Sequence, residues 1–353
     1  MFKKSLGKKN LVGLDIGSSS VKAIELTGKP GSLMLTNLGY EALQPDTVVD
    51  GQIMELNDVS NAISGLFSAH QIKTDRVAAG VSGSSVIVKN IIVPQMSEEE
   101  LEESIDWHAE EHIPFDISDV ALDYQIVGSG HDSLHVLMAA CKREFVANIR
   151  QAIQLAGRQP VVIDVDAFAL QNCYEVNYEP TDDQTVALLN IGAATMNINI
   201  LKGVRSVFTR DVSVGGQQYT SLLQKELGLT FEQAEAIKRG GPLPAGNESA
   251  DLDAILETVS DMLALEISKT FDFYRATAED SEAAVQKILV SGGGSKLRGL
   301  SEYLAGRFEI PVERFDPFRR IKVDARRFDP DYMRDIVPEM AVAVGLALRG
   351  VEA

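Results

Sequence analysis

The sequence predicts an α/β protein built from two similar halves that face a shared cleft. A pattern of strand, short Gly/Ser/Thr turn and second strand occurs at 11–26 and again at 186–201, which indicates two tight hairpins. A third, glycine-rich turn follows a buried strand at 288–291 and leads into a helix. The length of 353 residues is too great for one small core and fits two lobes.

The first half continues with further strands and a helix. Residues 32–43 are predicted to form another strand pair, and the apolar spacing over 57–69 predicts an amphipathic helix. The chain then leaves this half and returns to it through a strand at 161–165 and a helix that begins near Ala167.

Residues 83–157, between these segments, are predicted to form a compact α+β unit. A strand at 86–93 comes first. Ser97 with Glu100 three residues later is a capping box, which predicts an acidic helix that ends before Pro114. The remaining strands and helix are expected at 121–127, 134–140 and 143–156.

The second half begins at the hairpin of 186–201. The composition of 240–250 predicts a loop, and an apolar stripe over 251–279 predicts a long helix. Residues 319–334 mix charges with few apolar residues and are expected to be irregular or exposed. The apolar segment 339–348 predicts a final helix, for which amphipathic membrane binding is one interpretation.

The three turns have the composition of phosphate-binding loops. Successive backbone N–H groups in a Gly/Ser-rich turn form a concave anion site, and small side chains let a phosphate approach. Asp15, at the end of its strand, could hold a hydrated Mg²⁺ beside that phosphate. Two ordinary hairpins are the alternative, and the third turn weighs against it.

These turns resemble, in their order, the two phosphate loops and the adenosine loop of the actin/Hsp70/sugar-kinase ATPase superfamily. A narrower resemblance, over nearly the whole chain, is to the PilM family of actin-like cytoplasmic proteins of type IV pilus assembly, which are relatives of FtsA. The narrower resemblance is carried by the segments 165–170, 215–220, 266–274 and 340–349.

The resemblance implies an actin-like two-lobed ATPase fold, with duplicated ribonuclease-H-like lobes and a small inserted α+β subdomain. It implies that 1–82 and 158–185 form the first lobe and that 83–157 form the inserted subdomain. Residues 186–353 then form the second lobe with its adenosine loop. The helix at 339–348 would lie inside the molecule as the second connector between the lobes.

The resemblance also implies which residues bind the nucleotide. Asp15 would act as a catalytic residue and hold Mg²⁺ through water. The residues expected to bind the cofactor are Gly17, Ser18, Ser19, Ser20, Lys22, Asn190, Gly192, Ala193, Ala194, Thr195, Gly215, Gly216, Glu235, Lys238, Gly292, Gly293, Gly294 and Lys296.

Two acidic positions of the superfamily need separate comment. Asn190 stands where the superfamily has a second Asp, and an uncharged amide should lower both Mg²⁺ affinity and water activation. Asp166 matches the connector residue that orients the attacking water. The alternative is that Asp164 or Asp166 caps the following helix.

Glu235 and Lys238 lie three residues apart on a helix that Thr230 is predicted to cap, so they share one face. Their spacing matches the ribose and adenine contacts of the superfamily. A surface salt bridge is the alternative.

Other nucleotide and metal motifs have less support. His108 and His112 belong to an H-x-x-E-H pattern that would permit a zinc site, but no third ligand set is evident and an exposed acidic helix face is favoured. The chain has no G-x-x-x-x-G-K-[ST] and no G-x-G-x-x-G pattern, so P-loop and Rossmann folds are unsupported.

Composition limits the partners and the compartment. A net charge of −18 disfavours nucleic-acid binding. The two cysteines, Cys141 and Cys173, exclude a disulfide framework and fit a reducing compartment. No segment has the length and apolarity of a membrane span, so a membrane would be reached through a partner. The basic arm formed by Lys3, Lys4, Lys8 and Lys9 is expected to be a solvated tail, with weak contact to an anionic membrane as the alternative.

The expected function is that of a cytoplasmic, ATP-binding assembly protein, peripheral to the inner membrane and at most a slow ATPase. By resemblance, ATP and Mg²⁺ are the cofactors and the N-terminal cytoplasmic tail of the inner-membrane protein PilN is the partner. Contacts with pilus assembly ATPases and self-association are further possibilities. The alternatives are an FtsA-like division filament, against which the absence of an anchoring helix counts, and a small-molecule kinase, for which no sugar site is evident.

Overall fold

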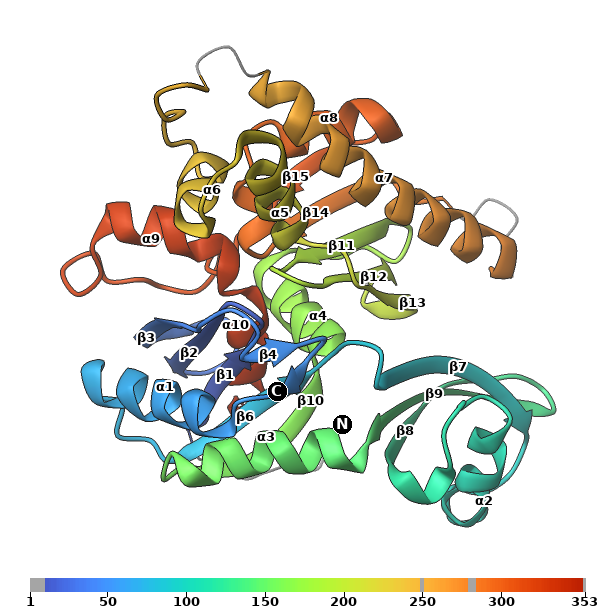
Figure 1. Ribbon diagram of the computed structural model, residues 1–353. Coiled ribbons are helices and arrows are strands. Elements are labelled where there is room, and N and C mark those ends of the chain that lie inside the picture. Colours follow the sequence, from blue (N-terminus) through green and yellow to red (C-terminus); the bar gives the residue numbers. More distant parts are fainter. Residues whose placement is uncertain (1–9, 248–250, 279–283, 352–353) are drawn as a thin grey trace.

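The computed structural model describes residues 10–247, 251–278 and 284–351. Figure 1 shows two lobes, one above the other, with a smaller unit beside the first lobe. The predicted basic arm lies outside the described residues.

The first lobe is built on a five-stranded sheet with the order β10-β6-β1-β2-β3. Strands β1, β2 and β3 form an antiparallel meander, whereas β6 and β10 run parallel to β1. The apolar face of α1 (Leu56–Ala69), which includes Ile63 and Phe67, packs in the core on this sheet. The strands are Val12–Ile16 (β1), Ser20–Thr27 (β2), Met34–Ala42 (β3), Arg76–Val81 (β6) and Gln159–Val165 (β10), with a small hairpin at Val48–Val49 (β4) and Gln52–Ile53 (β5).

The second lobe repeats this arrangement. Its sheet has the order β13-β12-β11-β14-β15, with an antiparallel meander followed by two parallel strands. The structure therefore confirms the prediction of two similar halves. The strands are Thr185–Ile191 (β11), Met196–Lys202 (β12), Arg205–Val212 (β13), Lys287–Ser291 (β14) and Val312–Arg314 (β15).

Four helices of the second lobe cover or flank this sheet. They are Gly216–Leu227 (α5), Phe231–Lys238 (α6), Leu252–Thr277 (α7) and Leu300–Phe308 (α8). The predicted apolar stripe of α7, with Val259, Leu263 and Ile267, is buried in the core. Thr230 caps α6 as predicted, since its side chain accepts from the Gln233 N–H.

The inserted unit has a core of its own. Its three-stranded sheet has the order β7-β9-β8, and α2 (Glu98–Glu110) packs on it through Leu101 and Ile105. Ser97 and Glu100 form the predicted capping box. The strands are Val86–Pro94 (β7), Val120–Ser129 (β8) and Ser133–Lys142 (β9).

Helix α3 (Arg143–Leu155) follows the insert but packs elsewhere. Its buried residues Phe145, Ile149 and Ile153 lie in the core of the first lobe, against α1. The domain boundaries that we predict at 83 and 157 remain a prediction, and α3 is the element on which the second boundary depends.

Two helices connect the lobes and pack against each other. They are α4 (Asp166–Asn177) and α10 (Ala341–Ala347), seen between the lobes in Figure 1. Every residue of α10 is buried, so this helix lies inside the molecule as expected and not on a membrane surface. Gly345 allows the crossing, because a Cβ atom there would lie 1.7 Å from the Ala169 carbonyl oxygen.

One prediction about secondary structure was wrong, and another was confirmed only in part. Residues 32–43 hold one strand, β3, and not a strand pair. The segment 319–334 is mostly exposed, as expected, but it is not irregular throughout, because α9 (Pro330–Ile336) begins within it, capped by Asp329 and with proline at its first position. Among the described residues, no helix is both long and apolar enough to cross a membrane.

Candidate functional site

The first predicted phosphate loop is a tight turn between β1 and β2. Its Gly17 N–H donates to the Ser20 carbonyl at 3.0 Å. Beside the turn, Asp15 and Lys22 face each other across the two strands, with 3.0 Å between the Lys22 Nζ and the Asp15 Oδ2. Burial works against the charged ammonium group, but attraction to Asp15 and to Glu339 outweighs it and raises the pKa of Lys22.

Asp166 lies behind this pair at the start of α4. Gly80 on β6 makes room for it, since a Cβ atom there would lie 1.9 Å from the Asp166 Oδ1. Burial, and then repulsion by Asp15, raise the pKa of Asp166 to about 8, although a hydrogen bond with Ser82 opposes the shift. The protonated form of this carboxyl group is therefore favoured at neutral pH.

The alternative role for the acidic pair before α4 was a helix cap, and the structure contradicts it. Helix α4 has no side-chain cap. Asp164 accepts instead from the Val165 N–H at 2.9 Å and forms an ion pair with Arg349. Asp166 is thus free of a capping role.

The second predicted phosphate loop, Gly192 to Thr195, is a matching turn between β11 and β12. The Gly192 N–H donates to the Thr195 carbonyl at 2.9 Å. Next to it, the Asn190 Nδ2 donates to the Asn197 Oδ1 at 2.9 Å. Asn190 thus occupies the place that corresponds to Asp15 in the first hairpin and is bonded to an amide, not to a lysine.

Helix α5 begins against this second loop. The Gly216 N–H donates to the Gly192 carbonyl at 2.9 Å, and the Gln217 N–H donates to the Ala193 carbonyl at 2.8 Å. A Cβ atom on Gly215 would lie 2.6 Å from the Gly192 oxygen, so glycine is required for this close approach. Gly215 and Gly216 therefore fix the loop from behind.

Glu235 and Lys238 form a partly buried cluster and not an exposed surface pair. The Lys238 Nζ donates to Glu235, to the Thr220 Oγ1 at 2.8 Å and to the Gly216 carbonyl at 3.2 Å. Burial lowers the pKa of Lys238, although its bond to Glu235 opposes the shift. The cluster joins α6 to the start of α5 beside the second loop.

The predicted adenosine loop follows β14. Gly292 adopts a φ of +81°, and a Cβ atom there would lie 2.4 Å from the Ile191 carbonyl oxygen, which places this loop against the end of β11. Lys296 closes the loop with ion pairs to Asp335 at 2.9 Å and to Glu339 at 3.1 Å. These carboxylates outweigh the effect of burial and raise the pKa of Lys296.

Glu339 is a cleft residue that sequence reasoning missed. It ends the short helical turn Val337–Glu339 just before α10, and its side chain is 13% exposed. Its charge acts on Lys22, Lys238 and Lys296, which belong to three different parts of the predicted site. The signal in the sequence that could have identified Glu339 is its place as a single acidic residue just before the alanine-rich helix.

The residues predicted for phosphate binding fit an anion. Within the described part of the chain, the backbone N–H groups of Ser18, Ser19, Ala193 and Ala194 donate to no protein acceptor. The Ser20 hydroxyl is buried and has no hydrogen-bond partner there. Buried polar groups are normally paired, so this hydroxyl is a candidate ligand contact.

Metal binding by protein groups alone is not supported. No group of three or more His, Cys, Asp or Glu side chains in the described residues could hold a metal ion. The H-x-x-E-H pattern, considered only as an alternative, does not lie on one helix face, because α2 ends at Glu110 and His112 lies beyond it. Asp15 could still hold Mg²⁺ together with phosphates, since this ion commonly uses one or two carboxylates plus its waters.

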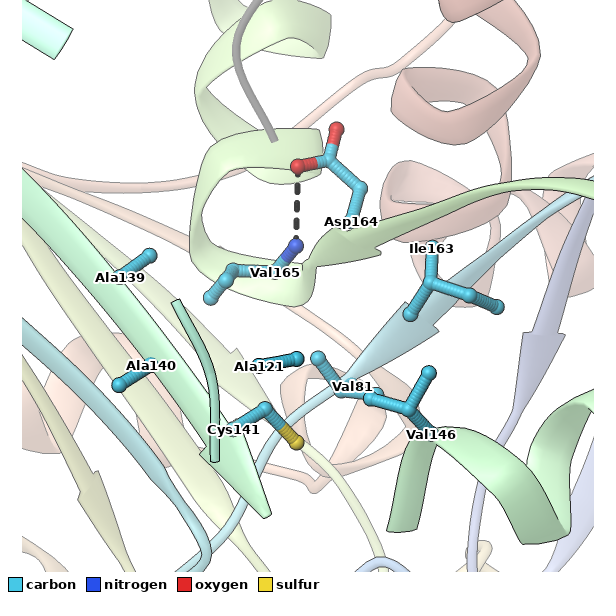
Figure 2. Close-up of a pocket in the computed structure, with 9 residues that line it drawn as sticks. All are labelled: Val81, Ala121, Ala139, Ala140, Cys141, Val146, Ile163, Asp164 and Val165. Atoms are coloured by element: carbon cyan, nitrogen blue, oxygen red, sulfur yellow. Dashed lines mark hydrogen bonds between the residues drawn. The ribbon is translucent and has the colours of Figure 1, made fainter. Parts of the chain in front are cut away.

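Two cavities lie at the junction of the insert with the lobes. The smaller, of about 20 Å³, is lined mostly by apolar residues of the insert and the first lobe, as Figure 2 shows. Burial raises the pKa of the Cys141 thiol in its wall to about 12, which fits the predicted packing role. The larger, of about 190 Å³, lies between β7, the start of α4 and β13, and Asp211 is part of its wall.

Comparison with protein families gives a match over residues 13–351 to the family described as type IV pilus assembly protein PilM. A solved structure described as the PilM-PilN type IV pilus biogenesis complex is 30% identical, with a TM-score of 0.87. That alignment covers 98% of this chain and 100% of the other.

More distant solved structures share the fold alone. The ethanolamine utilization protein EutJ from Carboxydothermus hydrogenoformans has a TM-score of 0.58 at 15% identity, over 98% of this chain and 91% of that one. MreB 5 of Spiroplasma citri has a TM-score of 0.52 at 14% identity, over 96% and 94%. The actin-like, two-lobed fold that the sequence predicts is thereby confirmed.

Among curated proteins, the cell division protein FtsA of Escherichia coli strain K12 is 26% identical over 263 residues. The match covers 67% of this chain and 61% of FtsA, so the chain spans about three fifths of the length of this relative.

Proposed function

Because the chain belongs to the family of the type IV pilus assembly protein PilM, we propose that it is an ATP-binding adaptor for an inner-membrane partner of the PilN type. The observation that carries this proposal is the match over nearly the whole chain to a structure described as a PilM-PilN complex. In this role the protein reaches the membrane through its partner.

Nucleotide binding in the cleft is supported by the convergence of the three loops. Unpaired N–H groups in two of them, the Ser20 hydroxyl and the Lys22 ammonium group are all suited to phosphate oxygens. MreB 5, with the same fold, was solved bound to AMPPNP. We assign Asp15 to hold Mg²⁺ through water when ATP is present, with Asn190 as a weaker, uncharged contact.

Hydrolysis is proposed to be slow, because Asp166 is protonated at neutral pH and a general base must be ionised. We expect any ATPase rate to rise as the pH increases through about 8 and to be lost in Asp166→Asn. Steady-state phosphate release between pH 6 and 9 checks this. A rate that is already maximal at pH 6.5 would contradict the assignment.

The same group gives a pH dependence of stability. The folded-state pKa of Asp166 lies above the unfolded value, so its contribution to the free energy of unfolding is complete below pH 4 and is lost as the pH rises through about 8. Urea unfolding should therefore show that the free energy of unfolding declines more steeply from pH 5 to 8 in the wild type than in Asp166→Asn.

The test of the proposed function is calorimetry with ATP and ADP in the presence of Mg²⁺, with and without a synthetic peptide of the cognate PilN N-terminal segment. We expect the protein to bind both ATP and the peptide. We also expect its affinity for the peptide to differ between the ATP-bound and the ADP-bound protein. Peptide binding that ignores nucleotide would make ATP a structural ligand. Failure to bind any nucleotide would contradict the assignment of the loops.

A further inference from the structure

The chain leaves the first lobe for the insert at Ser82 and Gly83, and this segment contacts two carboxylates of the cleft. Ser82 forms a hydrogen bond with Asp166, and the Gly83 N–H donates to the Asp211 Oδ2 at 2.6 Å. Gly83 has a φ of +91°, and a Cβ atom there would lie 2.8 Å from the Asp50 carbonyl oxygen. The position of the insert is therefore tied to Asp211, which belongs to the second lobe.

A row of side-chain hydrogen bonds runs from Asp211 back to the second phosphate loop. The Asn197 Nδ2 donates to the Asp211 Oδ1 at 2.8 Å, and the Asn190 Nδ2 donates to the Asn197 Oδ1 at 2.9 Å. The three residues are direct cross-strand partners on β11, β12 and β13. With Gly83 they make one continuous chain of three bonds from the loop to the start of the insert.

The direction of these bonds is fixed by chemistry. An ionised carboxylate only accepts, so Asp211 receives both the Gly83 N–H and the Asn197 amide group. The Asn197 oxygen must then face Asn190, and residue 190 must donate. A carboxylate at 190 would place two acceptors opposite each other, which accounts for asparagine where related ATPases have aspartate.

We propose that Asn190, Asn197, Asp211 and Gly83 form a polarised hydrogen-bond relay that couples the nucleotide loop to the position of the insert. This inference rests on the proposed function, since it assigns how ATP binding alters binding of the PilN segment. The Gly83 to Asp211 bond crosses from the first lobe to the second, so a rotation of the lobes makes or breaks it. That bond is the two-state element that both sites would bias.

Isosteric single substitutions test the relay. Asn190→Asp opposes two oxygens at the first bond or, if the Asn197 amide group turns over, at the second bond. Asp211→Asn alone leaves every bond satisfiable, because the amide groups of Asn190 and Asn197 can turn over together. The readout is the ratio of the peptide Kd without ATP to that with saturating ATP, for which we expect at least about fivefold in the wild type. Asn190→Asp should reduce this ratio to below about twofold, whereas Asp211→Asn should keep the ratio within about twofold of the wild-type value.

The double variant Asn190→Asp with Asp211→Asn should restore the coupling. Asp at 190 would accept from Asn197, whose oxygen would accept from Asn at 211, which in turn would accept from the Gly83 N–H. The two bonds between side chains are then remade in the opposite direction, the Gly83 N–H still donates to residue 211, and the total charge is unchanged. We expect the ratio to return to within about twofold of the wild-type value, as a double-mutant cycle requires for directly coupled residues.

Asn90→Ala is the matched control. The Asn90 Nδ2 donates to the Val207 carbonyl at 3.4 Å, so it also joins the insert to the second lobe but has no link to Asn190. The ratio of peptide Kd values without and with ATP should stay at the wild-type value in this variant. A merely structural relay would lower the stability of Asn190→Asp and leave its ratio unchanged, which would overturn the proposal.

The experiment distinguishes failure of the relay from failure of the proposed function. A wild-type protein that binds ATP and peptide independently overturns the relay but leaves both binding activities intact. A double variant that stays uncoupled while it binds both ligands also overturns it. A wild-type protein that binds no ATP overturns the proposed function itself, and the relay with it.

Discussion

Replacing Lys22 by methionine is expected to weaken ATP binding by about 30-fold or more. Truncation of one partner of a buried charge pair costs about 2–5 kcal/mol, and the Lys22 Nζ lies beside the first phosphate loop, 3.6 Å from where a Cβ atom on Gly17 would be. The substitution also leaves Asp15 without its partner, close to the carboxyl group of Asp166. Repulsion of the phosphates by the unpaired Asp15 carboxylate adds to the loss. Calorimetric titration with Mg²⁺ and ATP measures it.

Lys287→Met is the control for this substitution. Lys287 is also a strand lysine with an ion pair, 2.9 Å from Glu313, and its side chain is 22% exposed. Lys287 lies at the end of β14 that is far from the adenosine loop, so the ATP affinity of Lys287→Met should match that of the wild type. If Lys22→Met bound ATP within about threefold of the wild type, the phosphates could not lie at this loop.

Gly345→Ala is expected to lower the free energy of unfolding by about 3 kcal/mol or more, since overpacking against backbone cannot be relieved by a change of rotamer. The new methyl group would lie 1.7 Å from the oxygen and 2.3 Å from the carbon of the Ala169 carbonyl. Helices α4 and α10 would have to separate. Urea unfolding followed by circular dichroism measures the change.

Gly65→Ala makes the same substitution in α1, where no atom lies within 4 Å of the added Cβ. Because alanine is the better helix former, this variant should gain up to about 1 kcal/mol. The free energy of unfolding should thus fall in Gly345→Ala and rise in Gly65→Ala. Equal stability of Gly345→Ala and the wild protein would mean that the helix crossing is looser than described.

The parts of the fold that the sequence predicted well are those with local signals. The paired hairpins, the capping box at Ser97, the helix cap at Thr230 and the apolar stripe of α7 each depend on residues within a few turns of one another. The glycine turn after β14 belongs to the same class. Periodicity and capping chemistry were sufficient for these elements.

The parts that escaped prediction depend on distant contacts. Helix α3 has an ordinary amphipathic pattern, which cannot tell whether its partner is the insert or α1. Glu339 and Asp211 looked like common acidic residues until the fold brought them to the cleft. Their role comes from neighbours more than 40 residues away, Lys296 for one and Gly83 for the other. One sequence does not report such pairs.

The crossing of α4 and α10 also limits how the lobes can move. Gly345 of α10 lies directly on the Ala169 carbonyl of α4, and Gly13 of β1 lies on the Ala343 carbonyl of α10, so these contacts leave little room for α10 to slide along either neighbour. Any closure of the cleft must then be a rotation about this fixed pivot. A small rotation of the lobes about this crossing would produce a larger displacement at the outer end of the insert, as a lever does about its pivot. The pivot here is the glycine contact between the two connecting helices.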